Sequence, residues 1–365
     1  MSRLHESLDG PATTTMTEPV LSIGLPVYNG ENWLTVSLDS ILQQTRGDFE
    51  LIIADNGSTD GTQAICCARA ARDPRIRYVR NNENLGAAAN YNLVLKLARA
   101  PLFKWHAHDD QLAPDCLERC VAVLERNPQA VACITGARRL DAHGRELLRW
   151  DSPLHGTEST DPAVRFGTIV RTFYCNWTEI FSVMRRSAIA RALPHRAFRG
   201  TDIAILAELA LLGPFVRIDA PLFIHRDHAT RYYNTADSDP AAVLAWYDPK
   251  RRGDRVWHKW ALYRSHLAAI RRHRLPPTIK LRCYAQLLRS MTMWVNLKGL
   301  ARDVAWSVDP RLLTAKRRLQ QLLLQPSGVR FTDGCDHAAE RPHGQPVRCS
   351  RIYGGRECVA SERRS

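Results

Sequence analysis

Between about residues 20 and 135, short apolar runs alternate with amphipathic runs of helical spacing, and this alternation constrains the fold more than any other feature. The apolar runs begin at Val20, Phe49, Ile76, Leu102 and Val131. Such alternation is typical of βαβ units, whose strands pair in parallel. The sequence therefore predicts an α/β domain with a mostly parallel sheet flanked by helices, in which the loops after the strands meet at one edge.

Beyond residue 135 the pattern changes twice. Residues 136–200 are less regular, and an apolar stripe then predicts a helix over Thr201–Leu212, followed by two short strands at 215–218 and 222–224. From Trp257 onward, basic and aromatic residues predict helix pairs interrupted at Pro276-Pro277 and Asp309-Pro310.

These patterns divide the chain into segments. The segments are a leader (1–18), an α/β domain (19–235, with halves 19–135 and 136–235), a helical extension (236–325) and a tail (326–365). The leader and the tail are polar and poor in core-forming residues, so we expect them to be disordered.

Composition limits the classes of binding partner and of protein that this chain can belong to. The formal net charge of +14 favours anionic partners, namely nucleic acid, an anionic membrane surface or a phosphate-bearing substrate. No run of about 18 apolar residues is present, which argues against a membrane-spanning helix. The ten cysteines form no CxxC pair, as expected for buried thiols of a cytoplasmic chain and not for a zinc site or disulfide framework.

Two polar loops follow the first two predicted strands. They are Pro26-Val27-Tyr28-Asn29-Gly30 and Asp55-Asn56-Gly57-Ser58-Thr59-Asp60. Asp55 can accept hydrogen bonds from a base or ribose, and the adjacent glycines allow a ligand to approach the backbone closely. The alternative is that the second loop is only an Asx turn capping the next helix.

A third candidate is the pair Asp109-Asp110, which lies between a predicted strand and a helix that begins near Pro114. Two adjacent carboxylates stay ionised only where positive charge neutralises them. A divalent cation bridging the phosphates of a nucleotide would do so. The alternative is a solvated acidic turn that caps the helix.

Four motifs together match a known family. SIGLPVYNGENWLTVSLDSILQQT, FELIIADNGSTDGT, NENLGAAANYN and HDDQLAP, in this order and spacing, resemble the family 2 glycosyltransferases of GT-A fold. The resemblance is close over about residues 19–135 and looser over 136–230. It implies a Rossmann-like sheet, a nucleotide diphosphate sugar donor, inverting transfer and a divalent metal, Mn²⁺ or Mg²⁺.

The resemblance also implies roles for individual residues. Donor-binding roles fall to Pro26, Tyr28 and Glu31 in the nucleotide pocket, Asp55 at the base, and Asn84, Gly86 and Asn92 on the ribose and phosphate side. Asp109 and Asp110 would form the DxD-type element that binds the metal and the sugar diphosphate. Two positions depart from the family pattern. Ala107 stands where many relatives carry a further Asp, and Tyr91 stands where many carry Arg.

Asp202 opens the predicted helix at 201–212, where family members carry an Asp or Glu-Asp. The resemblance makes it the general base that deprotonates the acceptor hydroxyl. The alternative is an acidic residue placed in the first helical turn by the macrodipole.

The segment after the last predicted strand, Ile224 to Arg231, carries three further candidates. His228 matches a histidine that related enzymes use as a metal ligand, and imidazole suits a transition metal. Arg226 matches the arginine of that motif, and Arg226 or Arg231 could hold the diphosphate. The alternative is a solvated surface loop, and it stays open whether His108 or His225 replaces a metal ligand.

These observations predict a glycosyltransferase that uses a nucleotide diphosphate sugar donor and a saccharide or lipid-linked acceptor, in surface polysaccharide or glycolipid assembly. We expect a cytoplasmic protein, with peripheral contact to the inner face of the membrane through the basic and aromatic C-terminal helices. No nucleic acid partner is expected. The alternatives are a nucleotidyltransferase, disfavoured by the lack of a G-x-G-T-R type loop, and a non-catalytic basic protein that binds nucleic acid or membrane.

Overall fold

The computed structural model describes residues 18–172, 177–192, 194–229, 231, 240–254 and 256–308. The chain divides into two compact units, Met1–Thr292 and Met293–Ser365. Among the described residues, the first unit thus continues through three α-helices beyond residue 235. The expected leader, apart from Glu18, and the expected tail lie outside the described residues.

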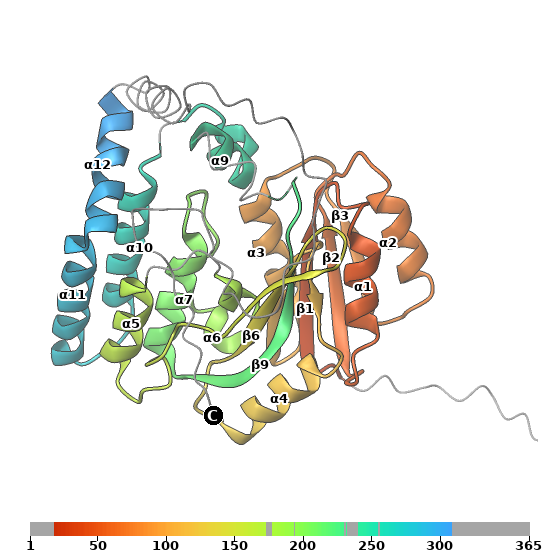
Figure 1. The fold of residues 1–365 in the computed structure, drawn as a ribbon, viewed down its shortest axis with the longest axis horizontal. Coiled ribbons are helices and arrows are strands. Elements are labelled where there is room, and N and C mark those ends of the chain that lie inside the picture. The colour runs from red at the N-terminus through yellow and green to blue at the C-terminus, as the bar shows by residue number, and fades with distance from the viewer. Residues whose placement is uncertain are drawn as a thin grey trace, which may run out of the picture. The chain divides into compact units, whose positions relative to one another are not determined.

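Nine strands of the described residues form one sheet in the first unit (Figure 1). Their order is β3(Ile76–Arg80), β2(Phe49–Asp55), β1(Leu21–Val27), β4(Leu102–Trp105), β8(Val183–Arg185), β6(Ala132–Leu140), β9(Phe215–Arg226) and β5(Gln111–Leu112), with β7(Glu146–Trp150) also paired to β6. Strands β3, β2, β1 and β4 are parallel, as are β6 and β9, whereas β8, β5 and β7 pair antiparallel. This confirms the predicted α/β class.

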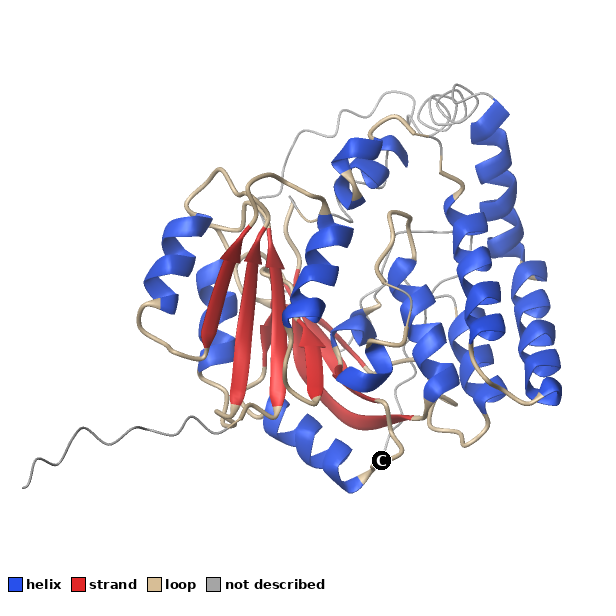
Figure 2. Ribbon diagram, turned by 180° about the vertical axis from the view of Figure 1, so that it is seen from behind, coloured by secondary structure: helices blue, strands red, loops and turns tan. Residues whose placement is uncertain are grey.

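Helices cover both faces of the sheet (Figure 2). On one face, the alternate residues Leu21, Ile23 and Leu25 of β1 join a buried cluster that also holds side chains of α1 and α4. On the other face, Gly24 lies so close to α3 that a Cβ would be 2.6 Å from a methyl carbon of Val94. The helices of this half are α1(Leu34–Leu42), α2(Thr62–Ala70), α3(Ala87–Leu97) and α4(Cys116–Arg126).

The second half of the first unit holds more regular structure than the sequence indicated. Its elements are α5(Pro162–Arg171), η1(Thr178–Phe181), α6(Arg186–Ile189), α7(Thr201–Leu212), α9(Pro240–Tyr247), η2(Pro249–Arg251), α10(His258–Arg272) and α11(Pro277–Thr292). Helix α7 is almost wholly buried because α5 and α10 pack against it. The second unit contributes α12(Trp294–Val308) to the described residues.

One prediction of secondary structure is wrong. The two short strands expected at 215–218 and 222–224 form the single strand β9. Pro221, which lies between the two ranges, lacks an N–H to donate to a neighbouring strand. Instead, Pro221 pairs with Gly136 of β6 at a register shift, where a Cβ on Gly136 would lie 3.1 Å from the Ala220 carbonyl oxygen. The irregularity absorbs the proline without ending the strand.

The parallel register places the predicted loops together. Val27, the last residue of β1, pairs with Asp55, the last residue of β2. The loops that follow both strands therefore start side by side at the carboxyl edge of the sheet.

Candidate active site

A cavity of about 920 Å³ opens at this edge. Its walls come from the loops after β1, β2 and β4, the start of α3, η1, the first turn of α7, the end of β9 and helix α9. Among the residues predicted from sequence, Pro26, Tyr28, Asn84, Asp109, Asp202 and His228 line it. The others lie around it and not on its surface: Glu31, Asp55, Gly86, Asn92, Asp110 and Arg226.

Asp109 and His228 meet in this cavity although 118 other residues separate them in sequence. The Asp109 Oδ2 and His228 Nε2 atoms are 3.0 Å apart, and the Trp33 ring stacks on the His228 ring at 5.2 Å. Burial raises the pKa of Asp109, but the Arg231 guanidinium and the His228 contact outweigh it and hold this pKa well below its ordinary value. Asp109 is therefore an anion at neutral pH.

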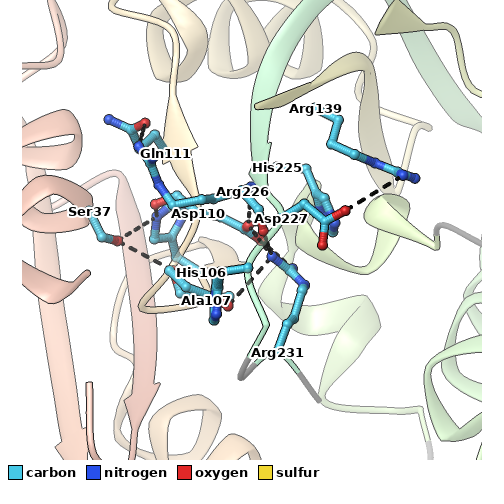
Figure 3. Close-up of polar contacts among 12 residues, drawn as sticks. Ser37, His106, Ala107, Asp110, Gln111, Arg139, His225, Arg226, Asp227 and Arg231 are labelled. Atoms are coloured by element: carbon cyan, nitrogen blue, oxygen red, sulfur yellow. Dashed lines mark hydrogen bonds and ion pairs between the residues drawn. The ribbon is translucent and has the colours of Figure 1, made fainter. Parts of the chain in front are cut away.

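Asp110 is fully buried and engaged on both oxygens. Its Oδ1 accepts from the Arg226 backbone N–H at 3.1 Å and from Arg231 Nη1 at 3.0 Å, and its Oδ2 accepts from Arg231 Nη2 at 3.2 Å (Figure 3). Arg231 also lies 3.5 Å from Asp109. A bidentate arginine pair is a strong, directional contact. Asp110 thus ties the loop after β4 to the end of β9.

The two histidines that flank Ala107 differ. His106 is fully buried, and its Nε2 lies 3.1 Å from both Ser37 Oγ and the Asp110 carbonyl oxygen (Figure 3). Burial lowers the pKa of His106 to about 3, so this imidazole is neutral and supports the loop. His108 lines the cavity, and His225 lines it too, with its Nδ1 3.8 Å from Asp110 Oδ1.

Asp202 lies in the first turn of α7, after Gly200, whose φ of +92° is in the left-handed region that favours glycine. The turn directs Asp202 to the cavity. Burial raises the pKa of Asp202 to about 6, although the Ile203 backbone N–H lowers it in part. This carboxylate is therefore ionised at pH 7 and yet basic enough to take up a proton.

Asp55 is fully buried behind the cavity. Its Oδ1 accepts from the Ser58 backbone N–H at 2.8 Å, and its Oδ2 accepts from the Tyr78 hydroxyl at 2.9 Å and lies 3.1 Å from Arg80 Nε. Asp55 does not cap the next helix; the Asx turn of this loop is made by Asp60, whose Oδ1 accepts from the Thr62 backbone N–H at 3.1 Å at the start of α2.

Asparagines connect the donor-side loops. Asn84 Oδ1 accepts from Asn56 Nδ2 at 2.8 Å and from the Gly86 backbone N–H at 2.9 Å. Gly86 has a φ of +85°, and a Cβ there would lie 2.3 Å from the Tyr247 carbonyl oxygen. Gly86 thus permits the close approach of α9 to the start of α3.

Asn92 lies in the middle of α3 and holds a different segment. Its Nδ2 donates to the His195 carbonyl oxygen and its Oδ1 accepts from the His195 N–H, each at 2.9 Å. Both backbone groups of His195 are held, and the His195 ring lines the cavity. Asn92 thereby fixes the segment that leads into α7 and Asp202.

Glu31 and Arg226 are likewise engaged. The Glu31 carboxylate accepts from the Gly61 N–H at 2.7 Å and closes the first two loops onto each other. The Arg226 guanidinium lies 4.9 Å from the centre of the Trp33 ring and donates to Gln111 at 2.8 Å. Arg226 is buried, so it supports the Trp33 and His228 stack from behind.

Comparison with known proteins identifies the family of the first part of this unit. A model described as glycosyl transferase family 2 matches residues 22–188. These residues belong to glycosyltransferase family 2.

Relatives of known sequence match part of the chain. Chondroitin synthase of Escherichia coli is 26% identical over 210 residues, covering 57% of this chain and 29% of that protein. A glycosyltransferase of Rickettsia bellii described as uncharacterized is 34% identical over 140 residues, covering 37% of this chain and 20% of that protein. The matched segment thus spans less than a third of either relative.

Solved structures agree on the fold. The structure of residues 1–349 of TarS from S. aureus aligns with a TM-score of 0.56 at 16% identity, covering 76% of this chain and 73% of that one. The first unit therefore has the GT-A fold of glycosyltransferases.

Several cavity residues lie outside the sequence motifs and were not predicted as site residues. Trp177, His195 and Trp246 line the cavity from η1, the segment before α7 and helix α9. Their only signal was an excess of aromatic residues in a stretch without clear periodicity. Trp33, the residue before α1, also lines the cavity and was not among the predicted site residues.

Proposed function

We propose that this chain transfers a sugar, with inversion at the anomeric carbon, from a nucleoside diphosphate sugar to a hydroxyl acceptor. The observation that carries the proposal is Asp202, a cavity carboxylate with a pKa raised to about 6. It shares the cavity with Asp109, from the loop after β4, and His228, from the segment after β9.

The donor occupies the side of the cavity built from the family motifs. Tyr28 and Asn84 line this side, and Asp55 stands behind it with its carboxylate held by Tyr78 and Arg80. TarS, which has the same fold, has been crystallised with UDP and with UDP-GlcNAc. This supports a nucleoside diphosphate sugar as donor here.

The chemistry of the two cavity ligands fits a divalent cation such as Mn²⁺ or Mg²⁺. A carboxylate oxygen of Asp109 and an imidazole nitrogen of His228 already lie 3.0 Å apart. The described residues hold no cluster of three or more such ligands, so donor oxygens would complete the coordination. A bound cation would neutralise charge that develops on the diphosphate leaving group. Asp110 pairs with Arg231 and thereby holds the loop after β4 in the position that presents Asp109 to the cation.

Asp202 performs the proton transfer. Its carboxylate accepts the proton of the acceptor hydroxyl as that oxygen bonds to the anomeric carbon. The bond from the anomeric carbon to phosphate breaks, and its electron pair leaves with the nucleoside diphosphate. A base on the face opposite the leaving group gives inversion.

The acceptor is a saccharide or lipid-linked hydroxyl in surface polysaccharide or glycolipid assembly. The similarity to chondroitin synthase over 57% of this chain supports a polysaccharide context. No helix of the described residues is long and apolar enough to cross a membrane.

Helix α11 supports contact with an anionic membrane surface. Its outer face exposes Leu281 (70%) and Leu288 (63%), next to the exposed Arg282 and Arg289. Apolar side chains flanked by arginines suit a membrane interface. The chain should float with vesicles of phosphatidylglycerol and phosphatidylcholine. A double variant with Leu281→Ser and Leu288→Ser should no longer float with them. Equal recovery of the variant would contradict the proposed face.

The proposed activity is tested by incubating the purified chain with UDP-, GDP- and dTDP-sugars and Mn²⁺. We expect one nucleotide class to raise the melting temperature, because a ligand that binds only the folded state stabilises it. Turnover with acceptor should give a product of inverted anomeric configuration by NMR. Equal stabilisation by triphosphate, heparin and every nucleotide would instead indicate a basic anion-binding protein.

A further inference from the structure

Helix α9 forms a wall of the cavity that the family motifs do not reach. Its Val243 and Tyr247 pack on Ala88 at the start of α3, and its Leu244 packs in a cluster with Ala204 of α7. The helix is therefore held between the donor-side loops and the helix that carries Asp202.

The fit at the donor side is tight. The carbonyl oxygen of Tyr247 lies where a Cβ on residue 86 would be, and the adjoining Lys250 and Glu83 form an exposed ion pair at 3.2 Å. Since only glycine allows this approach, the end of α9 is positioned by contact with the loop that holds Asn84.

The cavity face of α9 carries small side chains and two aromatic rings, Trp246 and Tyr247, which meet edge to face at 4.8 Å. Ala242, Ala245 and Trp246 line the cavity together, as expected for residues three and four apart on a helix. Trp246 is 40% exposed. The indole ring, partly exposed and next to two small side chains, therefore borders the cavity.

The rest of the cavity lining mixes aromatic rings with hydrogen-bonding groups. Trp177, Asp202 and Arg252 line the cavity with Trp246. A pyranose ring has an apolar face of C–H groups and a rim of hydroxyls, so it matches a flat aromatic surface with polar groups at its edge. The volume of about 920 Å³ is at the upper end for a single ligand site, which leaves room beyond a donor.

We infer that α9 forms the acceptor subsite and that Trp246 stacks on a pyranose ring of a saccharide acceptor. The inference rests on the proposed function and specifies its acceptor as a sugar, not a lipid alcohol or a protein side chain. The stacked sugar presents a hydroxyl to Asp202, because α9 packs against the first turns of α7. That oxygen bonds to the anomeric carbon, its proton goes to Asp202, and the nucleoside diphosphate leaves.

The test compares Trp246→Ala and Trp246→Phe with Trp257→Ala. Trp257 is a matched control because it is 43% exposed and does not line the cavity. The probe is an array of immobilised mono- and oligosaccharides, read in the presence of the nucleotide that stabilises the wild type. Calorimetric affinity for that nucleotide is measured on each preparation.

Wild type and Trp257→Ala should bind the same saccharides, Trp246→Ala should bind them at least tenfold more weakly, and Trp246→Phe should recover most of the affinity. Nucleotide affinity should stay within twofold in all four proteins. Where acceptor turnover is measurable, the acceptor KM should rise in Trp246→Ala while the donor KM does not.

Three results would overturn the inference. The first is saccharide binding by Trp246→Ala at wild-type strength. The second is a loss of nucleotide affinity in Trp246→Ala that equals its loss of saccharide affinity. The third is a wild type that binds nucleotide but no saccharide. Absence of nucleotide binding in the wild type would instead overturn the proposed function, so the two failures are distinguishable.

Discussion

The two terminal nitrogens of Arg231 lie 3.0 and 3.2 Å from the two carboxylate oxygens of Asp110. The same guanidinium is 3.5 Å from Asp109, so one arginine supplies positive charge to both members of the acidic pair. A buried carboxylate pair needs such a counter-charge. Arg231 and a divalent cation bound at Asp109 and His228 would therefore both neutralise the negative charge of this acidic pair.

Arg231→Gln should raise the affinity of the nucleotide-free protein for Mn²⁺, because the variant leaves Asp109 and Asp110 without their guanidinium partner. Without metal, removing one partner of a buried ion pair should lower the free energy of unfolding by about 3–5 kcal/mol. Electron paramagnetic resonance of free Mn²⁺ reports the affinity, and urea denaturation reports the stability. Arg289→Gln, at an exposed position of α11, is the control. Unchanged Mn²⁺ affinity in Arg231→Gln would contradict the shared-charge argument.

Asp202→Asn should reduce turnover by about 10²–10⁴-fold, the usual contribution of a positioned base. Asparagine keeps the shape of the side chain and suits a helix start nearly as well, so the fold should persist. Nucleotide affinity by calorimetry should stay within twofold of wild type, because the donor side of the cavity is intact. Turnover that also stays within a few-fold would rule out Asp202 as the base.

The raised pKa of Asp202 also sets a pH dependence. Its folded-state pKa is about 6 against an ordinary value of 3.8, so between about pH 4 and 6 the folded state keeps a proton that the unfolded state has lost. This group's contribution to stability therefore falls as pH rises through that window. The wild type should lose stability relative to Asp202→Asn from pH 4 to 6, and its turnover should rise over the same range. Parallel stability curves for the two proteins would contradict the raised pKa.

Gly86→Ala should destabilise the chain more than Gly144→Ala. Both glycines have a left-handed φ, +85° and +84°, but a Cβ at 144 meets nothing within 4 Å, whereas one at 86 lies 2.3 Å from the Tyr247 carbonyl oxygen. Backbone strain alone should cost about 1–2 kcal/mol at either site. The displaced α9 should add about 1–3 kcal/mol at residue 86. Equal losses in urea denaturation would show that α9 does not depend on this contact.

Local patterns predicted the first half of the fold and much of the site. The loops after the first two strands, and the positions of Asp109 and Asp202 after a strand and at a helix start, follow from hydrophobic periodicity and turn residues. Because parallel strands end at one edge, loops far apart in sequence could be assigned to one pocket. The family motifs lie in this half, where strand and helix signals are strongest.

The sequence by itself determined the α/β class, the family and the set of polar side chains at the carboxyl edge, since these depend on short-range spacing. Only the tertiary structure decided how those side chains divide their tasks. Asp110 and Asp109 are neighbours in sequence, yet Asp110 is paired with Arg231 while Asp109 faces the cavity with His228. Trp246 reaches the cavity because Gly86 admits α9, a contact between residues that no local pattern connects. Charge pairing and close packing depend on three-dimensional distance, which spacing along the chain does not encode.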